Sequence, residues 1–488
     1  MKRIYISLAL ALACLGAEAV TIECSPGELR NLVTEPETLS SLKINGTVDA
    51  SDLFYIASEM KSLRELDMSA VTISAYSGEA LNHISSYNAN TIPAGVFMDA
   101  PFTTVVLPAS EGLVIGEAAF AASAVTGITV PANVGELGQA IFAACKDLKE
   151  ATLHVSAGDY MFDACSALER VNLGNVSSIG TAAFKDCITL NEISGAANIS
   201  SIGSSAFQGD VSLKGFYMGE ALENIGARAF SGSGMQSAPL AQASNLRNVG
   251  DWAFEGCRDL RSASLPAGVS TVGDGCFAHC PQLASVNYQS DQIPPFVFKG
   301  TAVTGELSIP AGVKSIGAYS LANVDGVDTL ILPSSLEYIG DGAMEMMQGL
   351  KTIDVQTFTV VPELGEDVWL GVDQPSVTVK IPHDLKEGFE NADQWKYFSL
   401  WPVNSINDEF VIDSRRLSAA FDGMTLLLRS QGTDISSVEI YNDGGLLLYR
   451  SAVNADNAAI DTSAMSGNIF IVKCIVDNGS TALKMFRK

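Results

Sequence analysis

Apolar and polar positions along this chain follow a motif that returns every 20 to 24 residues. The motif reads Ile/Val-Gly-x-x-Ala-Phe, as at residues 179–184, followed by a small residue and then by a Leu at intervals of three. The aromatic slot is occupied by Phe97, Phe120, Phe142, Phe162, Phe184, Phe207, Phe230, Phe254, Phe277, Phe298, Leu321 and Met344. Between these motifs, Leu-x-x-Leu-x-Leu stretches alternate apolar and polar residues, as at residues 168–173. This alternation predicts one short strand in each repeat.

A repeat of this length cannot bury its apolar face alone, so its neighbours must stack to build one continuous core. The period predicts a mainly β, leucine-rich-repeat solenoid over residues 76–355. Each coil should add one strand to a parallel sheet and return through a short helical turn on the outer side. Within one strand, Arg170 and Asn172 should point outward while Val171 and Leu173 point into the core.

Departures from the period predict how the array ends. Residues 20–75 contain a strand-like stretch and a short capped helix, and we expect them to form an N-terminal cap. Residues 356–404 should form the C-terminal cap, with Phe389, Trp395 and Phe398 closing the core. Residues 405–488 carry short apolar runs separated by Gly, Asn and Asp, which is typical of a small separate β domain.

The first 19 residues have the pattern of a secretory signal peptide. A basic start precedes an apolar run that is too short to span a bilayer, and a small-x-small cleavage site precedes Val20. A rival interpretation makes Cys14 a lipid-modified residue, because the residues before it faintly resemble a lipobox. No other segment is apolar enough for a transmembrane helix.

Composition narrows the class of partner. Of the 488 residues, 47% are hydrophobic and 17% charged, which is typical of a folded chain, and the formal net charge is -26. Phosphate backbones would be repelled by this charge, so nucleic acid is excluded as a partner.

Five cysteines share the slot three residues after the aromatic position. These are Cys145, Cys165, Cys187, Cys257 and Cys280. Elsewhere the slot mostly holds small residues, so buried thiols that pack between coils are the favoured interpretation. Consecutive coils are within disulfide reach, which keeps an oxidised ladder as the alternative.

No pattern of catalytic chemistry stands out from the repeat. The four His residues, at positions 83, 154, 279 and 383, are far apart and lack neighbouring ligands. Residues 273–278 match a Gly-x-Gly-x-x-Gly/Ala dinucleotide motif, but they coincide with the repeat's own Gly and Phe positions. We therefore predict no catalytic residues, no metal ligands and no cofactor, and a protein that is not an enzyme.

The repeat units at residues 202–207 and 249–257 carry a resemblance to the BspA-type leucine-rich repeats of bacterial surface proteins. The likeness extends over roughly residues 40–400. It implies a right-handed solenoid, and it implies adhesion, since some members bind host matrix or plasma proteins or other bacteria. The family offers no catalytic residues to carry over.

The tail resembles the C-terminal sorting domain of type IX secretion cargo. The resemblance rests on residues 438–445 and 460–472 and on the basic end at 484–488. It implies an Ig-like β-sandwich that the outer-membrane machinery of Bacteroidota-type bacteria reads and usually removes. The protein would then be secreted or held on the outer-membrane surface of a Gram-negative bacterium.

Together these patterns favour an adhesin-like binding protein whose concave sheet meets an extracellular or host protein. Outward strand positions that the fold does not need are the candidate contacts, with Arg170, Asn172, Tyr217 and Asn287 the chosen four. Two alternatives stay open: a structural surface or matrix component, and a glycan-binding accessory protein.

Overall fold

The structure is a computed structural model of the chain. It describes residues 20–486 except 175, 267, 288–289, 404–416, 423, 431–433, 443–445, 468 and 477–478. The predicted signal peptide and Cys14 lie outside the described residues. Two compact units divide the chain between Val403 and Asn404. The predicted boundaries between caps and repeats remain predictions.

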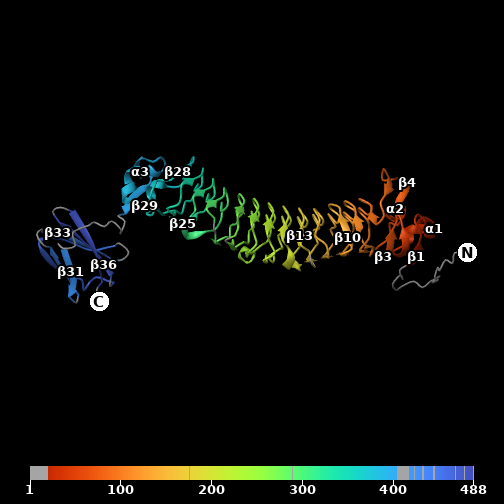
Figure 1. Cartoon of the computed structure of the whole chain (residues 1–488), viewed down its shortest axis with the longest axis horizontal. Helices are drawn as coiled ribbons and strands as arrows, with labels where there is room; N and C mark the ends of the chain where they lie inside the picture. Colours follow the sequence, from red (N-terminus) through yellow and green to blue (C-terminus); the bar gives the residue numbers. More distant parts are fainter. Residues whose placement is uncertain are drawn as a thin grey trace. The chain divides into compact units, whose positions relative to one another are not determined.

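The first unit is a β-solenoid of about 16 turns, with its coils side by side in sequence order (Figure 1). Parallel strands of successive coils form its main face. The first main sheet contains β1 (Val20–Cys24), β2 (Ser41–Val48), β3 (Glu65–Ile73), β7 (Thr104–Val106), β9 (Gly127–Val130), β11 (Glu150–Leu153), β12 (Arg170–Asn172) and β14 (Glu192–Ser194). Equivalent segments of later coils form β17 (Ser237–Ala238), β19 (Ser262–Ser264) and β21 (Ser285–Asn287), and then β23 (Thr304–Ser308), β25 (Gly326–Ile331), β27 (Thr352–Asp354), β29 (Thr378–Pro382) and β30 (Ser399–Val403).

A second set of parallel sheets was not predicted. Short strands at the Ile/Val-Gly corner pair from coil to coil. They are β6 (Thr91–Ile92), β8 (Leu113–Ile115) and β10 (Val134–Leu137); β13 (Ser178–Ile179), β15 (Ser201–Ile202), β16 (Asn224–Ile225), β18 (Asn248–Val249) and β20 (Thr271–Val272); and β22 (Gln292–Ile293), β24 (Ser315–Ile316), β26 (Tyr338–Ile339) and β28 (Glu363–Leu364). The corner glycine brings coils together: a Cβ at Gly203 would lie 2.5 Å from the backbone carbon of Gly180.

The Ala-Phe segment forms turns where the sequence predicted helical turns. Its backbone makes turn bonds, such as Lys185 N–H to the Ala182 carbonyl at 3.2 Å. Ala182 and Asp186 have φ values of 51° and 58°, and such left-handed residues prevent a helix from propagating. Bonds between coils replace the helical ones, since Phe184 N–H donates to the Ala206 carbonyl at 2.9 Å.

Stacked phenylalanines run through the core as the repeat predicted. The ring of Phe184 lies 5.4 Å, centroid to centroid, from both Phe162 and Phe207, and it is fully buried. Each ring therefore fills the space between its neighbours on the adjoining coils.

The five repeat cysteines are buried free thiols, and they do more than pack. Each thiol donates to the carbonyl of the aromatic residue one coil earlier, for example Cys187 Sγ to Phe162 O at 3.2 Å and Cys257 Sγ to Phe230 O at 3.1 Å. Burial raises the pKa of the Cys257 thiol to about 11, so the thiol stays protonated and remains a donor at neutral pH. The slot thus favours a small side chain that carries a hydrogen-bond donor.

One member of that slot breaks the pattern. Asp210 is fully buried, and its Oδ1 accepts from Cys187 N–H at 2.9 Å. Its Oδ2 has no hydrogen-bond partner. Burial raises the pKa of the Asp210 carboxyl well above its usual range, because the charged form is poorly solvated there.

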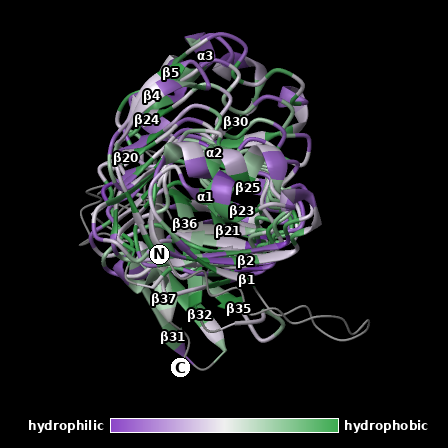
Figure 2. Cartoon of the chain, turned by 90° about the vertical axis from the view of Figure 1, so that its right-hand side faces the viewer, coloured by the Kyte–Doolittle hydropathy of each residue, from purple (hydrophilic) through white to green (hydrophobic). Residues whose placement is uncertain are grey.

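Helices close the N-terminal end of the solenoid. α1 (Leu29–Leu32) and α2 (Ala50–Glu59) lie across it, as Figure 2 shows end-on. The predicted capped helix is confirmed, since α2 begins at a capping box formed by Asp49 and Asp52. The strands of this cap, β1 to β3, continue the main sheet as three rungs, where the sequence predicted a single divergent coil. A hairpin of β4 (Tyr76–Leu81) and β5 (Ile84–Tyr87) projects between β3 and β6.

At the other end, β29 and β30 extend the sheet and α3 (Lys386–Asn391) packs beside them. Phe389, Trp395 and Phe398 are buried there, as predicted. The remaining helices are single 3-10 turns: η1 (Pro36–Thr38), η2 (Ala196–Asn198), η3 (Leu240–Gln242), η4 (Gln374–Ser376), η5 (His383–Leu385) and η6 (Trp395–Tyr397).

The second unit contains two antiparallel sheets. One is β31 (Leu417–Asp422), β32 (Thr425–Ser430) and β35 (Asn457–Asp461), and the other is β34 (Leu447–Ala455), β33 (Ile435–Asn442), β36 (Ile469–Val476) and β37 (Gly479–Phe486). Side chains from both sheets, among them Leu426, Ile440 and Phe470, form one core cluster. The strands predicted for this region are present.

Candidate functional site

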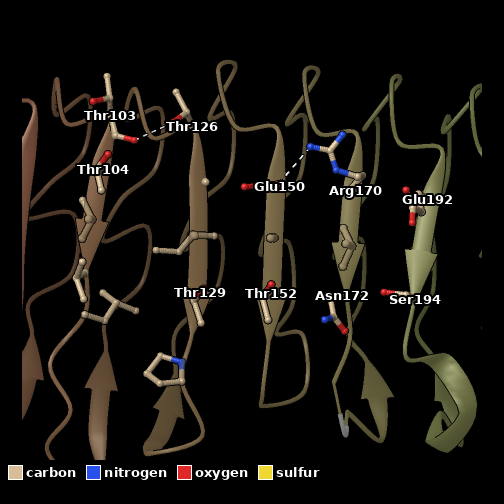
Figure 3. A pocket seen from close by; sticks show the side chains of 18 residues that line it. Thr103, Thr104, Thr126, Thr129, Glu150, Thr152, Arg170, Asn172, Glu192 and Ser194 are labelled. Atoms are coloured by element: carbon tan, nitrogen blue, oxygen red, sulfur yellow. Dashed lines mark hydrogen bonds and ion pairs between the residues drawn. The ribbon is translucent and has the colours of Figure 1, made fainter.

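Two rows of outward side chains cross the main sheet between β7 and β14 (Figure 3). Strand register places Gly127, Glu150, Arg170 and Glu192 in one row. The other row is Thr129, Thr152, Asn172 and Ser194. Alternation along each strand sends the intervening residues inward, and Val171 and Leu173 are buried as expected.

A hollow of about 710 Å³ lies over these rows. Gly127 pairs with Thr104 on one side and with Glu150 on the other, and it contributes no side chain between them. The absence of a side chain at this one rung deepens the surface. The side chains around the hollow are mostly hydroxyl, amide and carboxylate groups.

Arg170 is held between two carboxylates. Its Nη2 lies 3.2 Å from Glu150 Oε2, and its Nη1 lies 3.2 Å from Glu169 Oε2. All three side chains are about half exposed, so these ion pairs contribute little to stability, on the order of 0–1 kcal/mol each. Glu192 stands on the other side of Arg170 without an ion pair to it in the described part of the chain.

The four predicted contact residues do not all lie in this hollow. Arg170 and Asn172 line it. Tyr217 is 57% exposed on the next coil, where its ring lies over Gly219. Asn287 belongs to β21, seven coils beyond β9, and its side chain lies outside the described structure.

The coil that carries Tyr217 interrupts the main sheet. Residues 211–222 contain no strand, and the sheet resumes only at β17. Phe216 is buried there and packs on Phe207 and Phe230, with ring centroids 5.3 and 5.7 Å away. A second hollow of about 510 Å³ begins on the following coils, lined by small residues such as Ser237, Ala238 and Ser262. Tyr217 therefore stands on the coil between the two hollows.

Several lining residues were not among the chosen four. Thr104, Thr129, Glu150, Thr152 and Ser194 occupy the same outward slots as Arg170 and Asn172 on neighbouring strands. Applying the strand pattern to every coil could have found them. The pattern could not show that these coils, and not others, surround a hollow.

Among the described residues, no group of three or more His, Cys, Asp or Glu side chains is arranged to hold a metal ion. Nor does any helix in the described ranges reach the length and apolarity needed to cross a bilayer.

The repeats match a family model. The BspA type leucine-rich repeat region matches residues 90–214, 177–300 and 291–387, which together span more than half of the 488 residues. The chain belongs to this family. No curated protein matches it.

Solved structures of bacterial repeat proteins are similar to the chain. A leucine-rich repeat protein from Bacteroides ovatus is 17% identical, with a TM-score of 0.52 over 76% of this chain and 85% of that one. A leucine rich cell surface protein from Faecalibacterium prausnitzii is 18% identical, covering 57% and 85% with a TM-score of 0.30. The pneumococcal vaccine antigen PcpA is 14% identical, covering 78% and 81% with a TM-score of 0.32. The TM-score of the Bacteroides ovatus protein supports a shared solenoid fold.

Proposed function

We propose that the protein is a non-enzymatic binding protein at the bacterial cell surface, and that its main sheet binds an extracellular protein. The observation that carries this proposal is the pair of outward polar rows around the hollow between β7 and β14. Those side chains are not required by the core, because the inward residues of the same strands supply the packing. A broad shallow surface with hydrogen-bonding groups at regular spacing suits a protein partner better than a small molecule.

Replacing Asn172 and Tyr217 together with Ala should weaken capture of the ligand by about tenfold or more, because the exposed Tyr is the kind of residue that dominates interface energies. The ligand would first be isolated from host extracellular fluid with the full chain, identified and purified. Binding of the purified ligand would then be measured by surface plasmon resonance, and the thermal transition of the double variant should stay within about 2 °C of the parent.

Asn248→Ala with Tyr338→Ala is the matched control, because these residues present the same side chains on the second sheet. Equal loss in the control, or unaltered binding by the main-sheet variant, would place the binding site elsewhere.

Export is the second part of the proposal. The first 19 residues would direct the chain across the inner membrane, and the C-terminal unit would direct it across the outer membrane as an Ig-like type IX sorting domain. The division of the chain after Val403 supports this assignment, since a sorting domain must be recognised apart from its cargo. Secretion or display on the outer surface of a Gram-negative bacterium would follow.

Deleting residues 404–488 should leave the repeat unit folded but trapped in the periplasm. Cell fractionation and protease treatment of intact cells would measure the loss of surface material. Fusing the same residues to a folded periplasmic reporter should carry the reporter to the surface. Normal display of the truncated chain would refute the sorting role.

A further inference from the structure

The carboxylates of the first hollow outnumber its cations. Glu150 and Glu192 line it against a single Arg170, and Glu169 adds a further carboxylate at its edge. Arg170 is already paired with Glu150 and Glu169. On a chain of net charge -26, this hollow therefore presents negative potential with no unpaired cation among its lining residues.

The second hollow has a different character. Its lining is Ser, Ala, Pro and Gln, with no charged side chain. Tyr217 is exposed on the coil between the two, and its position over Gly219 keeps its ring close to the sheet surface. The surface is thus acidic at one end, aromatic in the middle and small and neutral at the other end.

Both hollows follow the same line across the coils. The strands that line them run from β7 to β21, with the Tyr217 coil among them. At a spacing of about 4.8 Å per coil the line is roughly 38 Å long, which an extended peptide of about twelve residues can span. A globular partner would reach only part of such a line with one convex surface.

We propose that the main sheet binds an extended polypeptide segment whose basic side chains lie over Glu150 and Glu192 and whose small side chains lie beyond Tyr217. This inference rests on the proposed binding function and names the chemistry of its partner. Arg170 contacts no ligand group in this arrangement, and instead lowers the negative charge of the hollow by pairing with Glu150 and Glu169.

The probe is a fluorescein-labelled peptide of about twelve residues, with Lys-Thr alternation in one half and Ala-Val alternation in the other. Its affinity for the full chain is measured by fluorescence anisotropy at low and high salt, beside a peptide in which Glu replaces every Lys. We expect the Lys peptide to bind more tightly and to lose affinity as salt rises. Equal binding of the Glu peptide would overturn the proposal.

Charge variants locate the interaction. Glu150→Gln with Glu192→Gln should weaken binding of the Lys peptide by about three- to tenfold. The matched control, Glu223→Gln with Glu337→Gln, removes the same charge beside the second sheet and should have at most a small effect. If both pairs weaken binding equally, the attraction belongs to the whole acidic surface, and the proposal is wrong.

Arg170→Ala separates this proposal from the broader one. It should tighten binding of the Lys peptide, by about two- to fivefold, because it removes the positive charge and releases two carboxylates. Weaker binding in this variant would mean that Arg170 contacts the ligand directly, which would overturn the basic-segment proposal. The proposed function would survive that result, since it fails only when the Asn172 and Tyr217 variant retains full binding of the natural ligand.

Discussion

Phe184→Ala should lower the free energy of unfolding of the solenoid by about 3–5 kcal/mol, one of the two largest effects that we expect from a single substitution. Phe184 is fully buried and stacks on a ring of each adjoining coil. Removing it leaves a cavity that neither coil can close, because the coils are held at fixed spacing by hydrogen bonds on both sides. Urea denaturation would measure the loss.

Hydrogen exchange should show where the loss acts. Contacts in a solenoid join only neighbouring coils, so faster exchange should be confined to the coils that carry Phe162, Phe184 and Phe207. Ile188→Ala, at a 46% exposed position on the same coil, is the control and should cost less than about 0.5 kcal/mol. A Phe184 variant as stable as the parent would contradict the stacked core.

Asp210→Asn should stabilise the protein by about 1–3 kcal/mol at pH 8, because it removes a buried charge whose Oδ2 has no partner. Asn keeps an oxygen that can accept from Cys187 N–H. The carboxyl's pKa is raised in the folded state, so its protonated form stabilises the fold fully below the unfolded pKa. That stability is lost as pH rises through the folded pKa.

The gain from the Asn substitution should therefore shrink as pH falls toward 4 and grow as pH rises, which denaturant titrations at several pH values would measure. Asp259→Asn changes an exposed carboxylate near the same slot and should show no such pH trend. A constant difference between the Asp210 variant and the parent at every pH would mean that the carboxyl does not change its ionisation in this range.

The solenoid could be predicted because its signal recurs. A single Phe at a given position says little, but a Phe in the slot of Phe184 on ten coils specifies a buried ladder. The second sheet was missed because strands such as Ser201–Ile202 contain two residues, too few for an alternating pattern to register. The turns were taken for helices because nothing in the sequence marks Ala182 as left-handed.

The candidate site shows the limit of pattern more clearly. Alternation correctly placed Val171 inward, yet the hollow depends on which rung lies beside which, and Gly127 matters only because it pairs with Glu150. At Tyr217 the strand consensus continues but the strand does not form. The slot of Asp210 was interpreted as packing, and a packing pattern gives no warning of an unpaired buried oxygen.

The corner glycines give this architecture a rule for changing its length. Each coil meets the next through the same close backbone approach, as at Gly203, so the interface left by removing one whole coil closely resembles the interface that was there before. Recombination between repeats can therefore lengthen or shorten the array by entire coils while the Phe stack stays continuous. An insertion of any other size must leave the stack and project from it, as the β4–β5 hairpin does. Relatives that bind larger or smaller partners would be expected to differ by whole coils in the array and by hairpins at its margin.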